Sequence, residues 1–364
     1  MIDGIDGLEN VVAAETVLSE VDGLAGRLVI RGHSLDDLAG KIRFEDAAHL
    51  LWEGFFDNLP ADLAGPLGAA RAEVFAETAA LDDRLLKRNP MEGMRALTAR
   101  LADGESLDVA LKLLAAPAVF TAAVVRAQAG EPVMAPDPKL SHAADILRML
   151  RGRVPSADEA AALDTYLVTV SDHGLNASTF AARVISSTQA GLTSAVLGGI
   201  SALKGPLHGG APGPVIDMLD GIGRPENAQR WLENAVDRGD RLMGFGHRVY
   251  KVRDPRADAL KKAVRKLTDG SNAAPGRLAF AEAVEQAALD VLRTRKPNRS
   301  LQTNVEFYTA LLLEALAFPP SAFTCVFAMG RTAGWVAHAR EQLTGGRLIR
   351  PQSRYVGPAP GLAA

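Results

Sequence analysis

Strand-like sequence is confined to one short stretch near the start of this 364-residue chain, and this most constrains the fold. Thr16–Leu18 and Arg27–Ile30 flank Val21-Asp22-Gly23, a pattern typical of a small hairpin with a glycine-containing turn. Beyond this stretch, apolar residues recur mainly at helical spacing. One hairpin followed by helices predicts a nearly all-α protein.

Helical periodicity begins at Ser34, a good N-cap for Leu35 onward, and continues through Phe44–Trp52. Further helical windows span residues 60–85, 107–127, 139–151, 157–170, 256–268, 278–295, 304–316 and 322–343, with two more helices within 176–200. Residues 191–200 are rich in Ala, Ser and Gly. Small residues allow helices to approach closely, either in the core or across a subunit contact.

Charge and composition exclude several classes of protein. The net charge is −3 and no block of like charge occurs, which argues against nucleic acid as the main partner. No apolar run reaches about 18 residues, so no membrane span is expected. The N-terminus has neither a basic start nor an apolar segment, so we expect a cytoplasmic protein. The single cysteine, Cys325, lies in an apolar run and is expected in the core.

Two histidines, His208 and His247, lie beside glycines that break the chain into loops. Glycine lets the backbone approach a ligand closely, and a loop histidine is a plausible proton carrier. No His-Glu-x-x-His motif occurs, and one cysteine cannot build a thiolate zinc site. We therefore expect no metal.

Other polar residues are scattered along the chain. Residues 171–179 open a helix, and their simplest interpretation is a capped start with exposed polar residues. Glu306 falls in the first turn of a helix capped by Asn304, where the helix dipole favours an ionised carboxylate. Arg331 lies within an apolar helix, and a buried arginine needs an anionic partner. Together with Arg256 and Arg350, these groups suit proton abstraction beside a carbonyl while a small polyanionic acid is held.

Taken in order, these motifs resemble the citrate synthase family over almost the whole chain. The resemblance rests on DHGLNASTF at 172–180, GPLHGG at 205–210, GFGHRVY at 244–250, DPR at 254–256, NVEFY at 304–308 and GRTAGW at 330–335. It implies a homodimer of chains with a large helical domain, a smaller helical domain that closes over the substrates, and a small N-terminal β-hairpin. A break at 221–225 and a more charged composition after it place the small domain at 223–321, with residues 1–222 and 322–364 forming the large domain.

The resemblance also implies roles for individual residues. Glu306 would remove a proton from the methyl group of acetyl-CoA, His208 would donate a hydrogen bond to the thioester oxygen, and His247 would polarise the carbonyl of oxaloacetate and protonate the new hydroxyl. The residues implied to bind oxaloacetate are His173, Asn176, Arg256, Arg331 and, from the partner subunit, Arg350. Those implied to contact the CoA phosphates are Lys251, Lys296 and Arg299. No permanently bound cofactor is implied, since acetyl-CoA and CoA are substrate and product.

Three positions depart from the family pattern. Glu306 stands where the family has aspartate, Pro212-Gly213 replaces Asn-Glu in a loop expected beside His208, and Ile30 replaces tyrosine at a position expected to pack in the core. The implied reaction is condensation of acetyl-CoA with oxaloacetate, followed by hydrolysis of citryl-CoA to citrate and CoA. Two alternatives remain open: a 2-methylcitrate synthase that uses propionyl-CoA, and a non-catalytic paralogue that binds CoA or a dicarboxylate.

Overall fold

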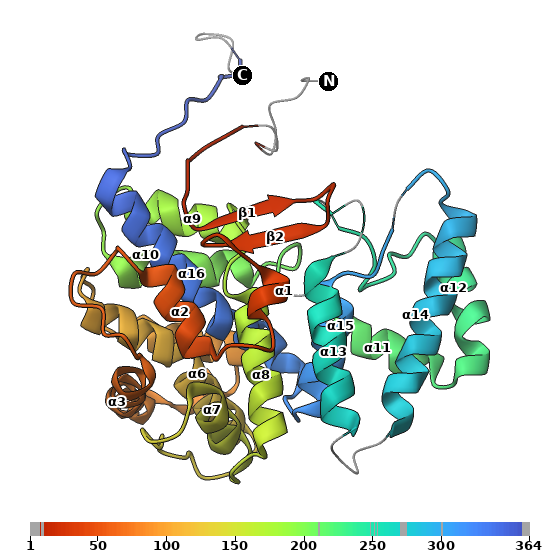
Figure 1. Cartoon of the computed structure of the whole chain (residues 1–364), viewed down its shortest axis with the longest axis horizontal. Coiled ribbons are helices and arrows are strands. Elements are labelled where there is room, and N and C mark those ends of the chain that lie inside the picture. The colour runs from red at the N-terminus through yellow and green to blue at the C-terminus, as the bar shows by residue number, and fades with distance from the viewer. Residues whose placement is uncertain are drawn as a thin grey trace.

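The protein is described by a computed structural model that covers residues 8, 11–209, 212–247, 249–250, 252, 254–269, 275–299 and 301–358. Within these ranges the chain forms sixteen α-helices, three short 3₁₀ helices and one small antiparallel sheet (Figure 1). The predicted all-α class with a small N-terminal hairpin is therefore confirmed.

The sheet has three strands, β1 (Ser19–Asp22), β2 (Arg27–Ile30) and β3 (His33–Ser34), in the order β1-β2-β3. In the β1–β2 hairpin, Ser19 pairs with Ile30 and Asp22 with Arg27. The prediction that Thr16–Leu18 form the first strand was wrong by three residues. The Asp22 carboxylate accepts hydrogen bonds from the amides of Leu24 and Ala25, which places the turn after Asp22.

A first group of helices surrounds a large apolar core. Its members are α1 (Leu35–Leu38), α2 (Phe44–Trp52), α3 (Ala64–Val74), α4 (Asp83–Leu86), α5 (Pro90–Thr98), α6 (Leu107–Gln128), α7 (His142–Arg151), α8 (Ala157–Val170), α9 (Ala177–Ser186), α10 (Leu192–Leu203) and α16 (Phe323–Gly345). The predicted Ser34 cap is present, because the Ser34 hydroxyl accepts a hydrogen bond from the amide of Asp37. Sequence analysis missed α5, although its Asn89 cap and first-turn proline are typical helix-start signals.

Helix α6 lies at the centre of this group, where it packs against α3, α5, α7 and α16. In the described part of the chain it alone is long and apolar enough to cross a membrane. Most of its residues are buried inside the protein, as expected for a core helix. Cys325 and Ile30 are also buried in the core, as predicted.

The small residues of α10 serve packing within the chain. A Cβ added to Gly198 would lie 2.2 Å from the side chain of Ile185 on α9, and one added to Gly199 would lie 2.7 Å from the Trp335 ring on α16. Of the two explanations left open for this helix, the structure supports close packing in the core at these two glycines.

A second group of helices lies beside the first (Figure 1). Its members are α11 (Pro212–Ile222), α12 (Ala228–Asp237), α13 (Pro255–Asp269), α14 (Pro275–Arg295) and α15 (Val305–Ala315). The prediction that Pro212-Gly213 lie in a loop was wrong, since they form the first turn of α11. Proline suits this position because the first helical amide needs no partner within the helix. The division at residues 222 and 321 stays a prediction.

Candidate active site

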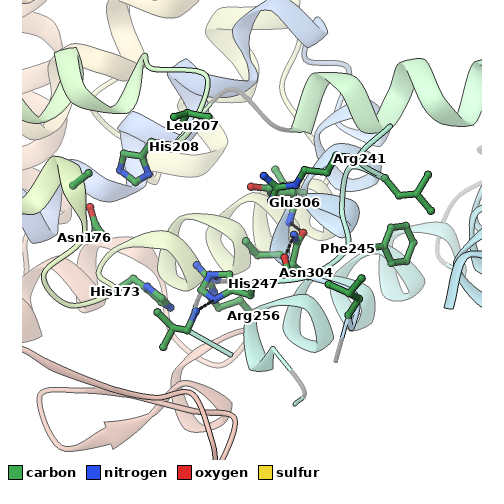
Figure 2. Close-up of a pocket in the computed structure, with 18 of the residues that line it drawn as sticks. His173, Asn176, Leu207, His208, Arg241, Phe245, His247, Arg256, Asn304 and Glu306 are labelled. Atoms are coloured by element: carbon green, nitrogen blue, oxygen red, sulfur yellow. Dashed lines mark hydrogen bonds between the residues drawn. The ribbon is translucent and has the colours of Figure 1, made fainter. Parts of the chain in front are cut away.

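One cavity of about 1660 Å³ lies where the two groups of helices meet. The predicted site residues that line it are His173, Asn176, His208, His247, Arg256, Lys296, Arg299, Glu306 and Arg331. Two predicted residues do not join them. Arg350 is exposed and does not line this cavity, and Lys251 falls outside the described residues. Figure 2 shows His208, Asn176 and His173 on one side of the cavity and Glu306 with Arg241 facing them.

His173 lies in the loop between α8 and α9, where Asn176 caps α9 by accepting hydrogen bonds from the amides of Ser178 and Thr179. The expectation that the polar residues of 171–179 are exposed was wrong, since most are buried. The reason is that the loop presses on α16, where a Cβ on Gly334 would meet the Ser171 carbonyl oxygen at 2.4 Å. Burial, together with the positive charge of Arg256, holds the pKa of His173 well below its ordinary value, so the ring is neutral.

His247 lies in the loop between α12 and α13, and its own backbone fixes its ring. Nδ1 accepts hydrogen bonds from the amides of Val249 at 3.1 Å and Tyr250 at 3.0 Å. A nitrogen that accepts from two N–H groups carries no proton, so the proton of the neutral ring is on Nε2. Nε2 lies 3.1 Å from Nη2 of Arg256, so the imidazole and the guanidinium meet at one point of the cavity.

Arg256 is buried in the first turn of α13 and is oriented by Asp254. The guanidinium donates to both carboxylate oxygens of Asp254, at 3.0 and 2.9 Å. Burial opposes the charge on Arg256, but the combined attraction of Asp254, Tyr250 and Glu306 outweighs burial and raises the arginine pKa. Asp254 also accepts a hydrogen bond from the Val305 amide, so it ties α13 to the start of α15.

Arg331 reaches the cavity from the middle of α16 and is almost completely buried. Its Nε donates to the carbonyl oxygen of Val170 at 2.6 Å, and its guanidinium lies over the Phe327 ring. Among the described residues no carboxylate lies within ion-pair distance of it, although Asp172 is close enough to favour its charge. Burial lowers its pKa to about 10, so it remains charged at neutral pH. Arg331 is therefore a buried cation, and an anionic ligand in the cavity would supply the negative charge that it lacks.

Glu306 projects into the cavity from the first turn of α15, where Asn304 accepts a hydrogen bond from its amide as the cap. Asn304 also donates to the carbonyl oxygen of Gly246, which joins the base of α15 to the His247 loop. Burial raises the pKa of Glu306, while Arg256 and Arg241 act in the opposite direction. A carboxylate with a raised pKa is a stronger base than an exposed one.

His208 lies in the turn after α10, with Nε2 2.8 Å from the Ser178 hydroxyl. Ser178 Oγ also accepts a hydrogen bond from the Trp335 indole. Burial, and secondarily Arg331, lowers the pKa of His208 to about 4, so the ring is neutral at pH 7. A neutral imidazole held at one nitrogen presents its other nitrogen to the cavity.

Comparisons with known proteins agree with this arrangement. The family model described as "Citrate synthase, C-terminal domain" matches residues 7–352. The chain is 37% identical to the citrate synthase of Haloferax volcanii, over 96% of this chain and 95% of the relative. The chain belongs to the citrate synthase family. It is therefore an acyltransferase of the citrate synthase type.

Two further relatives of the family bear on its ligands. A protein of Mycobacterium tuberculosis named 2-methylcitrate synthase is 34% identical, over 96% of this chain and 90% of the relative. The solved citrate synthase of Thermoplasma acidophilum, a ternary complex with carboxymethyl coenzyme A and oxaloacetate, has a TM-score of 0.82 at 29% identity and covers 97% of this chain and 96% of that chain.

Sequence analysis of this family member missed several residues of the site. Tyr250 hydrogen-bonds to His173 at 3.1 Å, Asp254 orients Arg256, and Arg241 lines the cavity near Glu306. Asp254 had a usable signal, since an aspartate directly before a proline is a common helix start. Arg241 had none, because nothing around it in the sequence distinguishes it from a surface arginine.

Proposed function

We propose that this protein condenses acetyl-CoA with oxaloacetate and hydrolyses citryl-CoA to citrate and CoA. The observation that carries the proposal is the convergence of Glu306, His208 and the His247–Arg256 pair on one cavity. A carboxylate base, a neutral hydrogen-bond donor and a carbonyl-polarising pair are the three groups that a condensation through an enol requires.

Glu306 is the proposed base. Its carboxylate takes a proton from the acetyl methyl group, and the thioester oxygen gains negative charge as the enol forms. His208 donates a hydrogen bond to that oxygen. The Ser178 hydroxyl lies 2.8 Å from Nε2 of His208 and donates to Oδ1 of Asn176 at 2.8 Å. For His208 to donate from Nδ1, this hydroxyl must turn its hydrogen to Nε2, which leaves the proton of the neutral ring on Nδ1.

His247 and Arg256 are the proposed electrophilic pair. Nε2–H of His247 and Nη2 of Arg256 both donate to the ketone oxygen of oxaloacetate, which draws electrons from the carbon that the enol attacks. As the new carbon–carbon bond forms, the oxygen becomes an alkoxide and takes the Nε2 proton. The amides of Val249 and Tyr250 at Nδ1, with the adjacent guanidinium, stabilise the charge left on the ring.

Binding of the two carboxylates of oxaloacetate is assigned to Arg331, Arg256 and His173, with Asn176 lining the same wall. Arg331 supports this assignment most directly, because among the described residues it lacks an ion pair. Lys296 and Arg299 are exposed or half-buried at the cavity and are proposed to contact the CoA phosphates. Lys251 has the same proposed role. No permanent cofactor is needed for this reaction.

Arg350 is proposed to complete the site of a partner subunit in a cytoplasmic homodimer. It lies on the C-terminal segment after α16, which extends away from the body of its own chain (Figure 1). The segment is exposed and carries three large apolar side chains, Leu348, Tyr355 and Val356. Apolar side chains on an extended arm support a second copy as the surface that covers them.

The test is a steady-state assay with oxaloacetate and either acetyl-CoA or propionyl-CoA, in which released CoA thiol is measured and the product acid is identified by mass. A higher kcat/KM with acetyl-CoA is the expected result. A preference for propionyl-CoA would instead support the 2-methylcitrate alternative, which the Mycobacterium tuberculosis relative favours. No turnover with either, in a folded protein that binds oxaloacetate, would support the non-catalytic alternative.

A further inference from the structure

The hydroxyl of Ser19, the first residue of β1, bridges the two neighbours of His173. It accepts a hydrogen bond from the amide of Gly174 at 2.9 Å. The hydroxyl hydrogen of Ser19 is donated to the carboxylate of Asp172, with which the hydroxyl makes a short contact. One side chain therefore holds the residues on both sides of a histidine that lines the cavity.

This bridge is backed by further contacts. Gly174 has a φ of 60°, a left-handed conformation that glycine adopts without strain, and it packs against Val21 of β1. On its other side, the Asp172 carboxylate lies 3.2 Å from Nε2 of His338, whose Nδ1 accepts from Arg183. Asp172 is thus fixed between α16 and the hairpin, and the loop that carries His173 has little freedom to shift.

The turn of the same hairpin contacts the second histidine loop. A Cβ added to Gly23 would lie 2.1 Å from the carbonyl oxygen of Val249, so the turn packs directly on the backbone at this residue. The amide of Val249 is one of the two donors that hold Nδ1 of His247. The hairpin therefore reaches the loop that orients the ring of His247.

The two loops also meet each other. The ring of His173 hydrogen-bonds to the Tyr250 hydroxyl at 3.1 Å and lies 5.7 Å from the ring of His247, centroid to centroid. Figure 1 shows the hairpin lying across the top of the molecule, from α9 toward the loops beside α13. Loops that come from the two groups of helices are thus held against one short two-stranded element.

We propose that the β1–β2 hairpin is a positioning element of the active site. Ser19 is the positioning residue for His173, and Gly23 is the positioning residue for the 247–250 loop. The hairpin sets the geometry between the two imidazoles and so controls how strongly the ketone of oxaloacetate is bound and polarised. The inference rests on the proposed function, because the geometry matters only for a ligand with a carbonyl between these groups.

The first test compares Ser19→Ala with Ser19→Thr, which keeps the hydroxyl and suits a strand. We expect Ser19→Ala to lower kcat/KM for oxaloacetate about 10- to 100-fold, the cost of a misplacement of about 1 Å, while KM for acetyl-CoA changes little. Ser19→Thr should recover most of the loss. The matched control is Glu20→Ala on the same strand, because Glu20 is exposed and Arg27, with which it forms an ion pair, is also in the hairpin. Thermal unfolding of each variant establishes that it is folded.

The second test uses Gly23→Ala, with Gly65→Ala as its control, because a Cβ on Gly65 meets nothing within 4 Å. The readout is the infrared stretching frequency of the ketone of bound oxaloacetate. We expect it to move toward the value in water in Gly23→Ala and to stay at the wild-type value in Gly65→Ala. If Ser19→Ala does not fold, the ketone frequency in Gly23→Ala still tests whether the hairpin positions the site.

Wild-type kinetics and ketone frequency in both folded variants, with an active wild-type enzyme, would overturn the positioning role and leave the proposed function intact. A folded wild-type protein without condensation activity would overturn the proposed function itself, and the positioning role with it. A lowered kcat with unchanged KM for both substrates and a wild-type ketone frequency would show that the hairpin only stabilises the fold, which would also overturn the inference.

Discussion

Replacing Glu306 with aspartate tests whether the site is built around a glutamate base. Glu306→Asp removes one methylene and withdraws the carboxylate by about 1 Å, given ordinary bond lengths. The substitution keeps the charge and the acceptor atoms. Any effect on the rate therefore reports the position of the base and not its chemistry.

The structure indicates that the backbone cannot move to compensate. The amide of Asn304 donates to Gly244 O at 2.9 Å, its side chain donates to Gly246 O at 2.8 Å, and the amide of Gly246 donates to Gln302 O at 2.7 Å. These bonds tie the start of α15 to the His247 loop. A misplacement of about 1 Å then costs about a hundredfold in rate, or about 2.7 kcal/mol of activation free energy.

The assay should isolate proton removal. Exchange of deuterium from labelled acetyl-CoA methyl, with a non-reacting oxaloacetate analogue bound, measures this step alone. We expect Glu306→Asp to slow it about a hundredfold and Glu306→Gln nearly to abolish it, because an amide cannot accept the proton. A faster rate in Glu306→Asp would refute the reasoning, since it would mean that α15 keeps a spacing suited to aspartate. Exchange at the wild-type rate in Glu306→Gln would remove Glu306 as the base.

Three other outcomes follow from the same geometry. Arg331→Leu should fold but raise KM for oxaloacetate, at a cost on the order of 2–5 kcal/mol of binding, and an unchanged KM would show that Arg331 serves only internal contacts. The base works deprotonated and burial raises its pKa, so kcat should fall as pH falls through that raised value. Arg241→Gln removes a charge that lowers this pKa and should move the acid limb to higher pH, whereas an unmoved limb would contradict Glu306 as the titrating group. Mixing a His247→Ala chain with an Arg350→Ala chain should restore some activity through heterodimers, and no recovery after verified subunit exchange would count against a shared site.

Local sequence signals located most of the helices, because caps and breaks act over a few residues. Ser34, Asn304 and the window Phe44–Trp52 were all predicted where the structure has them. The errors arose where a local pattern admits two structures. Thr16–Leu18 has the pattern of a strand, and only the hydrogen bonds that the Asp22 side chain accepts from the amides of Leu24 and Ala25 place the turn later. A proline such as Pro212 is typical of a loop that interrupts a helix, and it is equally typical of the first residue of a helix.

The sequence motifs predicted most of the residues that line the cavity, but they did not predict which other residues contact them. Nothing in the sequence near Ser19 indicates that its hydroxyl meets Asp172, more than 150 residues away. The same holds for Tyr250 on His173 and for Arg241 beside Glu306. Such contacts depend on how two groups of helices meet, and this is set by the packing of many apolar side chains. Charged residues at a cavity therefore look like surface residues until the fold is known.

The electrostatics of the cavity explain how buried arginines and acid–base chemistry can share one site. Burial and the nearby guanidiniums lower the pKa values of His173 and His208, so both rings stay neutral at pH 7. An imidazolium at either position would add a third positive charge to Arg256 and Arg331, at a high cost in a buried site. Neutral rings can still donate hydrogen bonds to carbonyl oxygens, and they leave the carboxylates of the substrate to the arginines. The same positive charges that are proposed to hold a dianion therefore also help burial to keep the imidazoles in the neutral form that the proposed reaction needs.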